Sequence, residues 1–66
     1  MNITLQPAVG NTRLIALDGS TQSGFYAQLG AGYVWNVFTC SGLCVASVNK
    51  SNQIVNALAD WLGSSK

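Results

Sequence analysis

The residues best suited to chemistry in this chain are its two cysteines, Cys40 and Cys44. Ser41-Gly42-Leu43 separates them, and a three-residue loop with a glycine is a common connection between antiparallel strands. If Cys40 pairs with Cys44 across such a hairpin, their Cβ atoms face each other and a disulfide can form. The alternative is two buried, reduced thiols that pack as small hydrophobic side chains. The C-x-x-C motif that redox catalysis normally uses is absent.

The other candidates for acid–base or nucleophilic chemistry have ordinary structural explanations. Asp18 belongs to a turn signal and Asp60 to the polar side of a helical pattern, whereas a glycosidase pair needs two carboxylates within about 10 Å of each other. The chain has no His, and none of its serines has a base placed by a recognisable motif. The glycines form no phosphate-binding motif. We therefore expect no enzymatic activity, no cofactor and no metal site.

Composition excludes further classes of function. The 66 residues carry a net charge of +1, and 48% of them are hydrophobic while only 8% are charged. This length has room for one small domain, residues 1–66. Three cations cannot hold a phosphate backbone, so we expect no nucleic-acid partner. The N-terminus lacks a basic region followed by a continuous apolar stretch, so no signal peptide is predicted and synthesis in the cytoplasm is expected.

Residues 19–49 contain no charged side chain. Globular proteins are typically about 25% charged, and a soluble monomer normally has a mixed charged surface. We therefore expect copies of this chain, or a larger protein lattice, to cover part of the surface. A surface of uncharged polar residues is the alternative.

Alternation of apolar and polar residues predicts short strands in the first three quarters of the chain. Ile3 and Leu5 alternate with polar neighbours, and Pro7 ends that run. Residues 13–17 form an apolar run that ends at Asp18-Gly19, a hairpin signal because a type I′ turn needs two residues with positive φ. A polar run follows, so the returning strand is expected to start only at Phe25.

Residues 33–40 are rich in aromatic and β-branched side chains, which is typical of a strand. Both faces of that strand are largely apolar, so we predict that it is central and covered on both sides. A hairpin joins it to residues 44–48 in a register that pairs Cys40 with Cys44 and Phe38 with Ala46.

The last segment changes to helical spacing. Ile54, Leu58 and Trp61 fall on one side of a helix that is predicted over about residues 52–62, with Ser51 as N-cap and Gly63 as the C′ residue. The predicted fold is therefore α+β: a small antiparallel β-meander of about four or five short strands, followed by one C-terminal helix.

The aromatic residues are candidates for protein contacts. Trp and Tyr are enriched at the centre of interfaces, and we expect Tyr33, Trp35 and Trp61 to be interface anchors. Core packing is the alternative for each of them. Stacking on nucleobases is disfavoured because the chain has no positive groove.

These features favour a non-enzymatic structural or interaction subunit of a larger symmetric assembly, most concretely a small virion protein such as a capsid cement, decoration or minor structural protein. The first alternative is a membrane-active or membrane-inserted protein, bacteriocin-like or a short bitopic subunit, because residues 25–48 are uncharged and long enough to span a bilayer. Polar residues and glycines interrupt that stretch, and no basic cluster flanks it. The second alternative is a small inhibitor or adaptor that docks on one partner protein.

Overall fold

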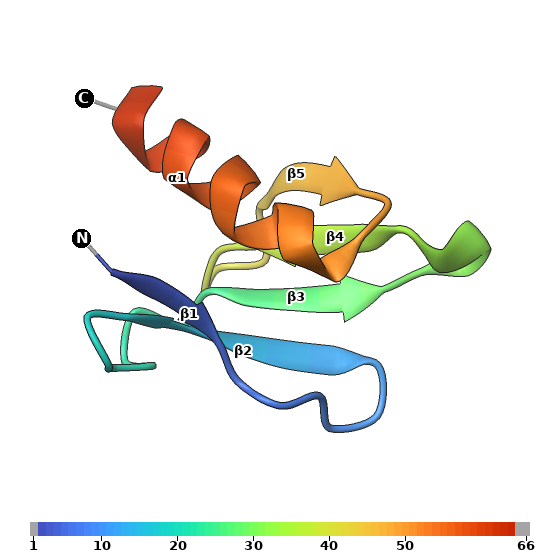
Figure 1. Ribbon diagram of the computed structural model, residues 1–66, viewed down its shortest axis with the longest axis horizontal. Coiled ribbons are helices and arrows are strands. Elements are labelled where there is room, and N and C mark those ends of the chain that lie inside the picture. The colour runs from blue at the N-terminus through green and yellow to red at the C-terminus, as the bar shows by residue number, and fades with distance from the viewer. Residues whose placement is uncertain (1, 65–66) are drawn as a thin grey trace.

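The computed structural model describes residues 2–64 and confirms the α+β prediction. Five strands form one antiparallel sheet, and a single helix follows them (Figure 1). The helix, predicted over residues 52–62, begins two residues later and is preceded by a 3-10 turn. The elements are β1 (Ile3–Leu5), β2 (Thr12–Leu17), β3 (Tyr26–Leu29), a 3-10 turn (Ala31–Tyr33), β4 (Trp35–Phe38), β5 (Cys44–Val48), a second 3-10 turn (Ser51–Gln53) and α1 (Ile54–Ser64).

The strands lie in sequence order, so every connection in the sheet is a hairpin. Successive hairpins alternate between the two ends of the strands, which run roughly along the long axis of the molecule (Figure 1). We call one end the Tyr33 end: it holds the loops of residues 6–11 and 30–34 and the connection of residues 49–53. We call the other the Asp18 end: it holds the loops of residues 18–25 and 39–43.

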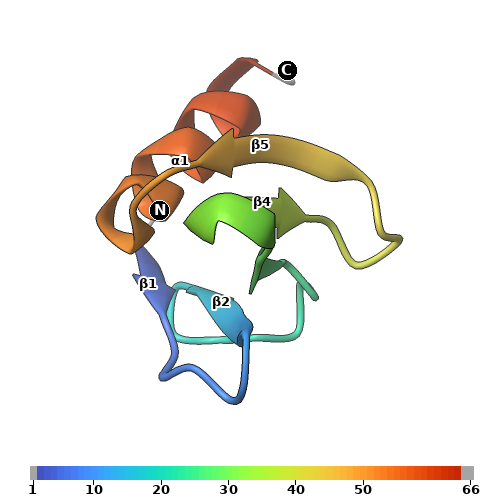
Figure 2. The same ribbon diagram turned by 90° about the vertical axis from the view of Figure 1, so that its right-hand side faces the viewer.

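The core lies between α1 and one face of the sheet. Its fully buried side chains come from alternate positions of β2, β3 and β4 and from one side of the helix: Ile15, Ala27, Val37, Ile54 and Leu58. Alternation in the strands and a four-residue repeat in the helix bring these side chains together. The sheet curls so that α1 contacts both edge strands, β1 and β5 (Figure 2). One short helix therefore closes the concave side of the whole sheet.

The Asp18-Gly19 signal forms the turn that the sequence predicts. Both residues have positive φ, 53° and 84°, and the N–H groups of Leu17 and Ser20 donate to each other's carbonyl oxygens at 2.8 and 3.1 Å. The Asp18 carboxylate also accepts the backbone N–H of Asn2 at 2.8 Å, which ties the turn to the start of the chain. Strand β3 begins at Tyr26, one residue beyond the predicted start.

Strand β4 is shorter than predicted. Tyr33 has a φ of 60° and belongs to the 3-10 turn, and residues 39–40 belong to the next loop, so the paired strand is limited to Trp35–Phe38. The helix covers the face of β4 that carries Val37, and on the opposite face Asn36 and Phe38 are half-buried. The strand is central, between β3 and β5, as predicted, and none of its residues is exposed.

The predicted register of the β4–β5 hairpin is also wrong, and Gly42 is the reason. The N–H of Thr39 donates to the carbonyl of Leu43 at 2.9 Å, so the loop is Cys40-Ser41-Gly42. A three-residue hairpin needs its third residue in the left-handed region, and Gly42 has a φ of 91°. Phe38 therefore pairs with Cys44, and a bulge then brings Val37 opposite Ala46.

The expected ends of the helix need two corrections. Ser51 begins a 3-10 turn and is not the N-cap of α1; its carbonyl accepts the N–H of Ile54. Gly63 lies inside α1 and is not the C′ residue, because the helix continues to Ser64. The 3-10 turn bends the chain from the end of β5 onto the concave face of the sheet.

We predict that Gly24→Ala lowers the stability of the fold more than Gly10→Ala does. Both substitutions strain a left-handed backbone, but only Gly24 is also closely packed against another loop. Gly24 has a φ of 79°, and a Cβ there would lie 2.3 Å from the Cβ of Cys40. Overpacking and left-handed strain together are expected to lower the free energy of unfolding by about 3 kcal/mol. Gly10→Ala is the control, because Gly10 has a φ of 64° with nothing within 4 Å. Equal losses in urea denaturation would contradict the close packing of the two loops.

A second prediction concerns the core. Leu58 is fully buried, so Leu58→Ala is expected to lower the free energy of unfolding by about 2–5 kcal/mol. In a domain this small, such a loss leaves most molecules unfolded at 25 °C. Leu43→Ala, at a position that is 59% exposed, is expected to change stability by less than about 0.5 kcal/mol. Far-UV circular dichroism of both variants checks the contrast.

Candidate functional site

The convex face of the sheet, opposite the helix, carries a row of apolar side chains. The register of β2, β3, β4 and β5 aligns Leu14, Tyr26, Phe38 and Cys44 as cross-strand neighbours, and we call them the outer row. The rings of Tyr26 and Phe38 stack with centroids 5.2 Å apart and planes inclined by 24°. Leu14 is 50% exposed. An antiparallel sheet with one solvated face normally presents polar residues there, so this row departs from the usual pattern.

A row of uncharged polar side chains runs beside the outer row. Thr12, Gln28, Asn36 and Ser47 are cross-strand neighbours on the same face, nearer the Tyr33 end by two residues in β2, β3 and β4 and by three in the bulged β5. Gln28 Nε2 donates to Thr12 Oγ1 at 3.5 Å, and Ser47 Oγ donates to Asn36 Oδ1 at 2.7 Å. The convex face thus combines an apolar strip with a polar margin, as protein interfaces do, and neither row contains a charge.

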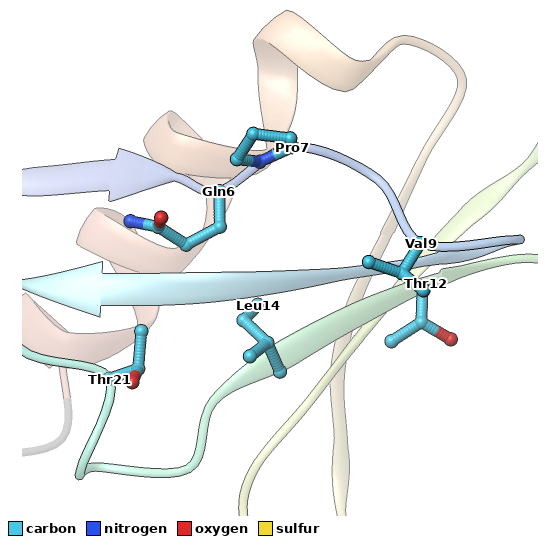
Figure 3. Close-up of a pocket in the computed structure, with 6 residues that line it drawn as sticks. All are labelled: Gln6, Pro7, Val9, Thr12, Leu14 and Thr21. Atoms are coloured by element: carbon cyan, nitrogen blue, oxygen red, sulfur yellow. The ribbon is translucent and has the colours of Figure 1, made fainter.

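An open pocket of about 660 Å³ lies next to Leu14 (Figure 3). The loop between β1 and β2 and the start of the loop after β2 form its walls, and its lining is Gln6, Pro7, Val9, Thr12, Leu14 and Thr21. No acid, base or thiol is among these residues. The lining can therefore hold an apolar group and offer hydroxyl or amide hydrogen bonds, but it provides no group for proton transfer or nucleophilic attack.

Both cysteines are exposed free thiols in the structure. The alternative of two buried thiols is therefore wrong. Cys40 lies in the hairpin loop against Gly24, and Cys44 ends the outer row with its Sγ 3.6 Å from the carbonyl oxygen of Ala46. The two residues do not pair across the strands, so the argument for a disulfide from facing Cβ atoms no longer holds. The disulfide itself stays a prediction.

The three expected anchors have different surroundings. Trp35 and Trp61 are half-buried and pack against the core, and the Trp61 ring meets Phe25 edge to face at 6.1 Å. Tyr33 is 80% exposed at the tip of the β3–β4 hairpin. Of the three, Tyr33 alone presents most of its ring to solvent.

The backbone of Tyr33 is strained. Its φ of 60° follows Gly32 at 75°, and the hairpin closes where the Gly30 N–H donates to the Val34 carbonyl at 2.7 Å. A left-handed conformation costs a bulky residue about 1–2 kcal/mol relative to glycine. An exposed aromatic ring therefore occupies a position where glycine fits the turn better, and nothing in the core requires that ring.

The two carboxylates do not form a catalytic arrangement. Asp18 is held in its turn by the N–H of Asn2, Asp60 is exposed on α1, and neither lines the pocket. Residues 2–64 also hold no group of three or more His, Cys, Asp and Glu side chains that could bind a metal ion.

Sequence reasoning missed the outer row and the pocket. Leu14 and Tyr26 are 12 positions apart, and only the β2–β3 register makes them neighbours. The signal that could have found the row was the parity of the strands, because every second residue of each strand has to lie on the face without a helix.

Comparison with models of protein families, with curated proteins and with solved structures finds no match. In the described part of the chain, α1 is too short to cross a membrane. Residues 26–48, which lie in the stretch considered as a membrane span, fold into β3, β4 and β5.

We predict that Tyr33 and Trp35 respond oppositely to truncation. Tyr33→Gly removes an exposed ring and relieves left-handed strain, so the free energy of unfolding is expected to stay constant or to rise by up to about 1 kcal/mol. Trp35→Ala removes a ring that packs on the core and is expected to cost about 3 kcal/mol. Thermal melts of both variants test the assignment, and a loss of stability in Tyr33→Gly contradicts it.

Proposed function

We propose that this chain is a non-enzymatic structural subunit of a larger symmetric assembly, in which it contacts copies of itself or a larger structural protein. The outer row carries this proposal. Leu14, Tyr26, Phe38 and Cys44 form an apolar strip on the face opposite α1, where Leu14 and Cys44 are exposed and the two rings are half-buried. Apolar side chains on a solvated face favour burial against another chain.

The small core supports the same proposal. Among residues 2–64, only Ile15, Ala16, Ala27, Val37, Ile54 and Leu58 are fully buried. Hydrophobic burial and conformational entropy nearly cancel in a domain of this size, so contacts with neighbours add stability that the chain alone lacks. The concrete form that we propose is a small virion protein, such as a capsid cement, decoration or minor structural protein. In such a role neighbouring subunits cover much of a charge-poor surface.

The dependence of the melting temperature on protein concentration tests this proposal. If association stabilises the folded chain, its melting temperature is expected to rise by about 5 °C or more between about 10 μM and 1 mM protein. Light scattering during size exclusion is expected to show a mass above 6.9 kDa at the higher concentration. Leu14→Ser in the outer row is expected to reduce the shift in melting temperature if this row lies in the contact, whereas Asn56→Ser on the exposed side of α1 serves as control. A monomer with a high, concentration-independent melting temperature argues against the proposal.

A further inference from the structure

The two ends of the sheet carry charges of opposite sign. Lys50 is exposed at the Tyr33 end, two residues beyond the Trp35–Val48 pair, and Arg13 lies near the same end of β2. Asp18 is exposed at the tip of its turn at the other end. Asp60 is exposed in the second half of α1, which runs toward the Asp18 end (Figure 1). The four described charges therefore divide by sign along the long axis.

Each end also presents apolar side chains at its loop tips. Val9 and Tyr33 are 82% and 80% exposed at the Tyr33 end, and Leu43 is 59% exposed at the Asp18 end. At each end, one contact ties neighbouring segments together. The Leu29 N–H donates to the Asn11 carbonyl at 2.8 Å at one end, and Gly24 packs against Cys40 at the other.

The strained backbone of Tyr33 points to a contact at this end independently of the charges. Its left-handed backbone displays the ring to solvent at a cost that a glycine in the same turn avoids. Strained residues that the core does not require are concentrated at functional positions. Tyr side chains are also over-represented among the residues that dominate protein contacts.

We propose that the Tyr33 end of one copy docks against the Asp18 end of a second copy, so that chains associate head to tail. This inference rests on the proposed function and names its partner and orientation. In the contact, Tyr33 and Val9 provide the apolar anchor, and Lys50 faces an end that carries carboxylates. Two identical ends would instead bring like charges together, which disfavours a symmetric end-to-end dimer.

The small area of each end determines how the chains can assemble. The molecule measures 22 × 22 Å across its long axis, so an end offers roughly 500 Å² of projected area, below the roughly 800 Å² per partner of a standard interface. A single contact is therefore weak. Because the contact is heterologous, it repeats and closes into a ring or extends as a filament, where neighbouring contacts reinforce one another.

Sedimentation velocity over about 10 μM to 1 mM protein tests the apolar anchor. The wild-type mass is expected to rise with concentration, and less so at high salt because salt screens the opposite charges. Tyr33→Gly, which retains the fold, is expected to weaken association at least about tenfold. Tyr33→Phe keeps the ring and the strained backbone and is expected to associate as the wild type does.

Reversing the charges at either end tests the head-to-tail orientation of the chains, and this test does not depend on Tyr33. Lys50→Glu alone, and Asp18→Asn with Asp60→Lys in one chain, are each expected to self-associate about threefold to tenfold more weakly at low salt. A mixture of these two variants is expected to recover wild-type association, because each kind of end then meets its complement. Asp18→Asn is chosen because asparagine tolerates positive φ and keeps an oxygen for the Asn2 N–H.

The outcomes separate the two proposals. If the wild type associates while the Tyr33→Gly and charge variants behave as the wild type, the head-to-tail contact is overturned and the proposed function stands. If the wild type is monomeric at every concentration and its melting temperature does not change, both head-to-tail association and self-assembly are overturned. If the mixture of charge variants fails to recover while each variant is folded, the assigned orientation is overturned.

Discussion

A single helix of 11 residues has to cover a five-stranded sheet, and the rest of the structure depends on that constraint. The helix reaches both edge strands only because the sheet curls around it. Ile54 and Leu58 meet Ile15, Ala27 and Val37 on the concave side, and that contact is the core. Within residues 2–64 no second helix or sheet packs on the convex side, where Leu14 and Cys44 are exposed and the Tyr26 and Phe38 rings are half-buried.

The elements could be predicted from the sequence where a local pattern determines them. The Asp18-Gly19 pair forms its type I′ turn because both residues accept positive φ, and the spacing of Ile54 and Leu58 indicates one side of a helix. The pairing of β4 with β5 could not be predicted in the same way. It depends on which loop residue adopts the left-handed conformation, and Gly42 takes the third position where the middle one was expected.

The candidate site was the least predictable part because it belongs to no single segment. Leu14, Tyr26 and Phe38 come from three strands, and a shift of one residue in any pairing would move a side chain to the other face. The sequence predicts Tyr33, Trp35 and Trp61 alike as anchors, and only the structure shows that Tyr33 is exposed while the two Trp side chains pack against the core. Composition predicts that a partner covers part of the surface, and the register shows which apolar side chains lie together on the face opposite the helix.

The two edges of the sheet affect how this protein tolerates crowding. Strand β1 has three residues, and β5 carries a bulge within its five. A long, regular edge offers unpaired backbone groups to any passing strand, which leads to cross-β aggregation. A short or bulged edge strand pairs poorly with a strand of another molecule. A charge-poor, β-rich chain with such edges can therefore reach a high local concentration while backbone pairing between molecules stays suppressed. In the assembly that we propose, association between copies is then left to side chains, which can be specific and reversible.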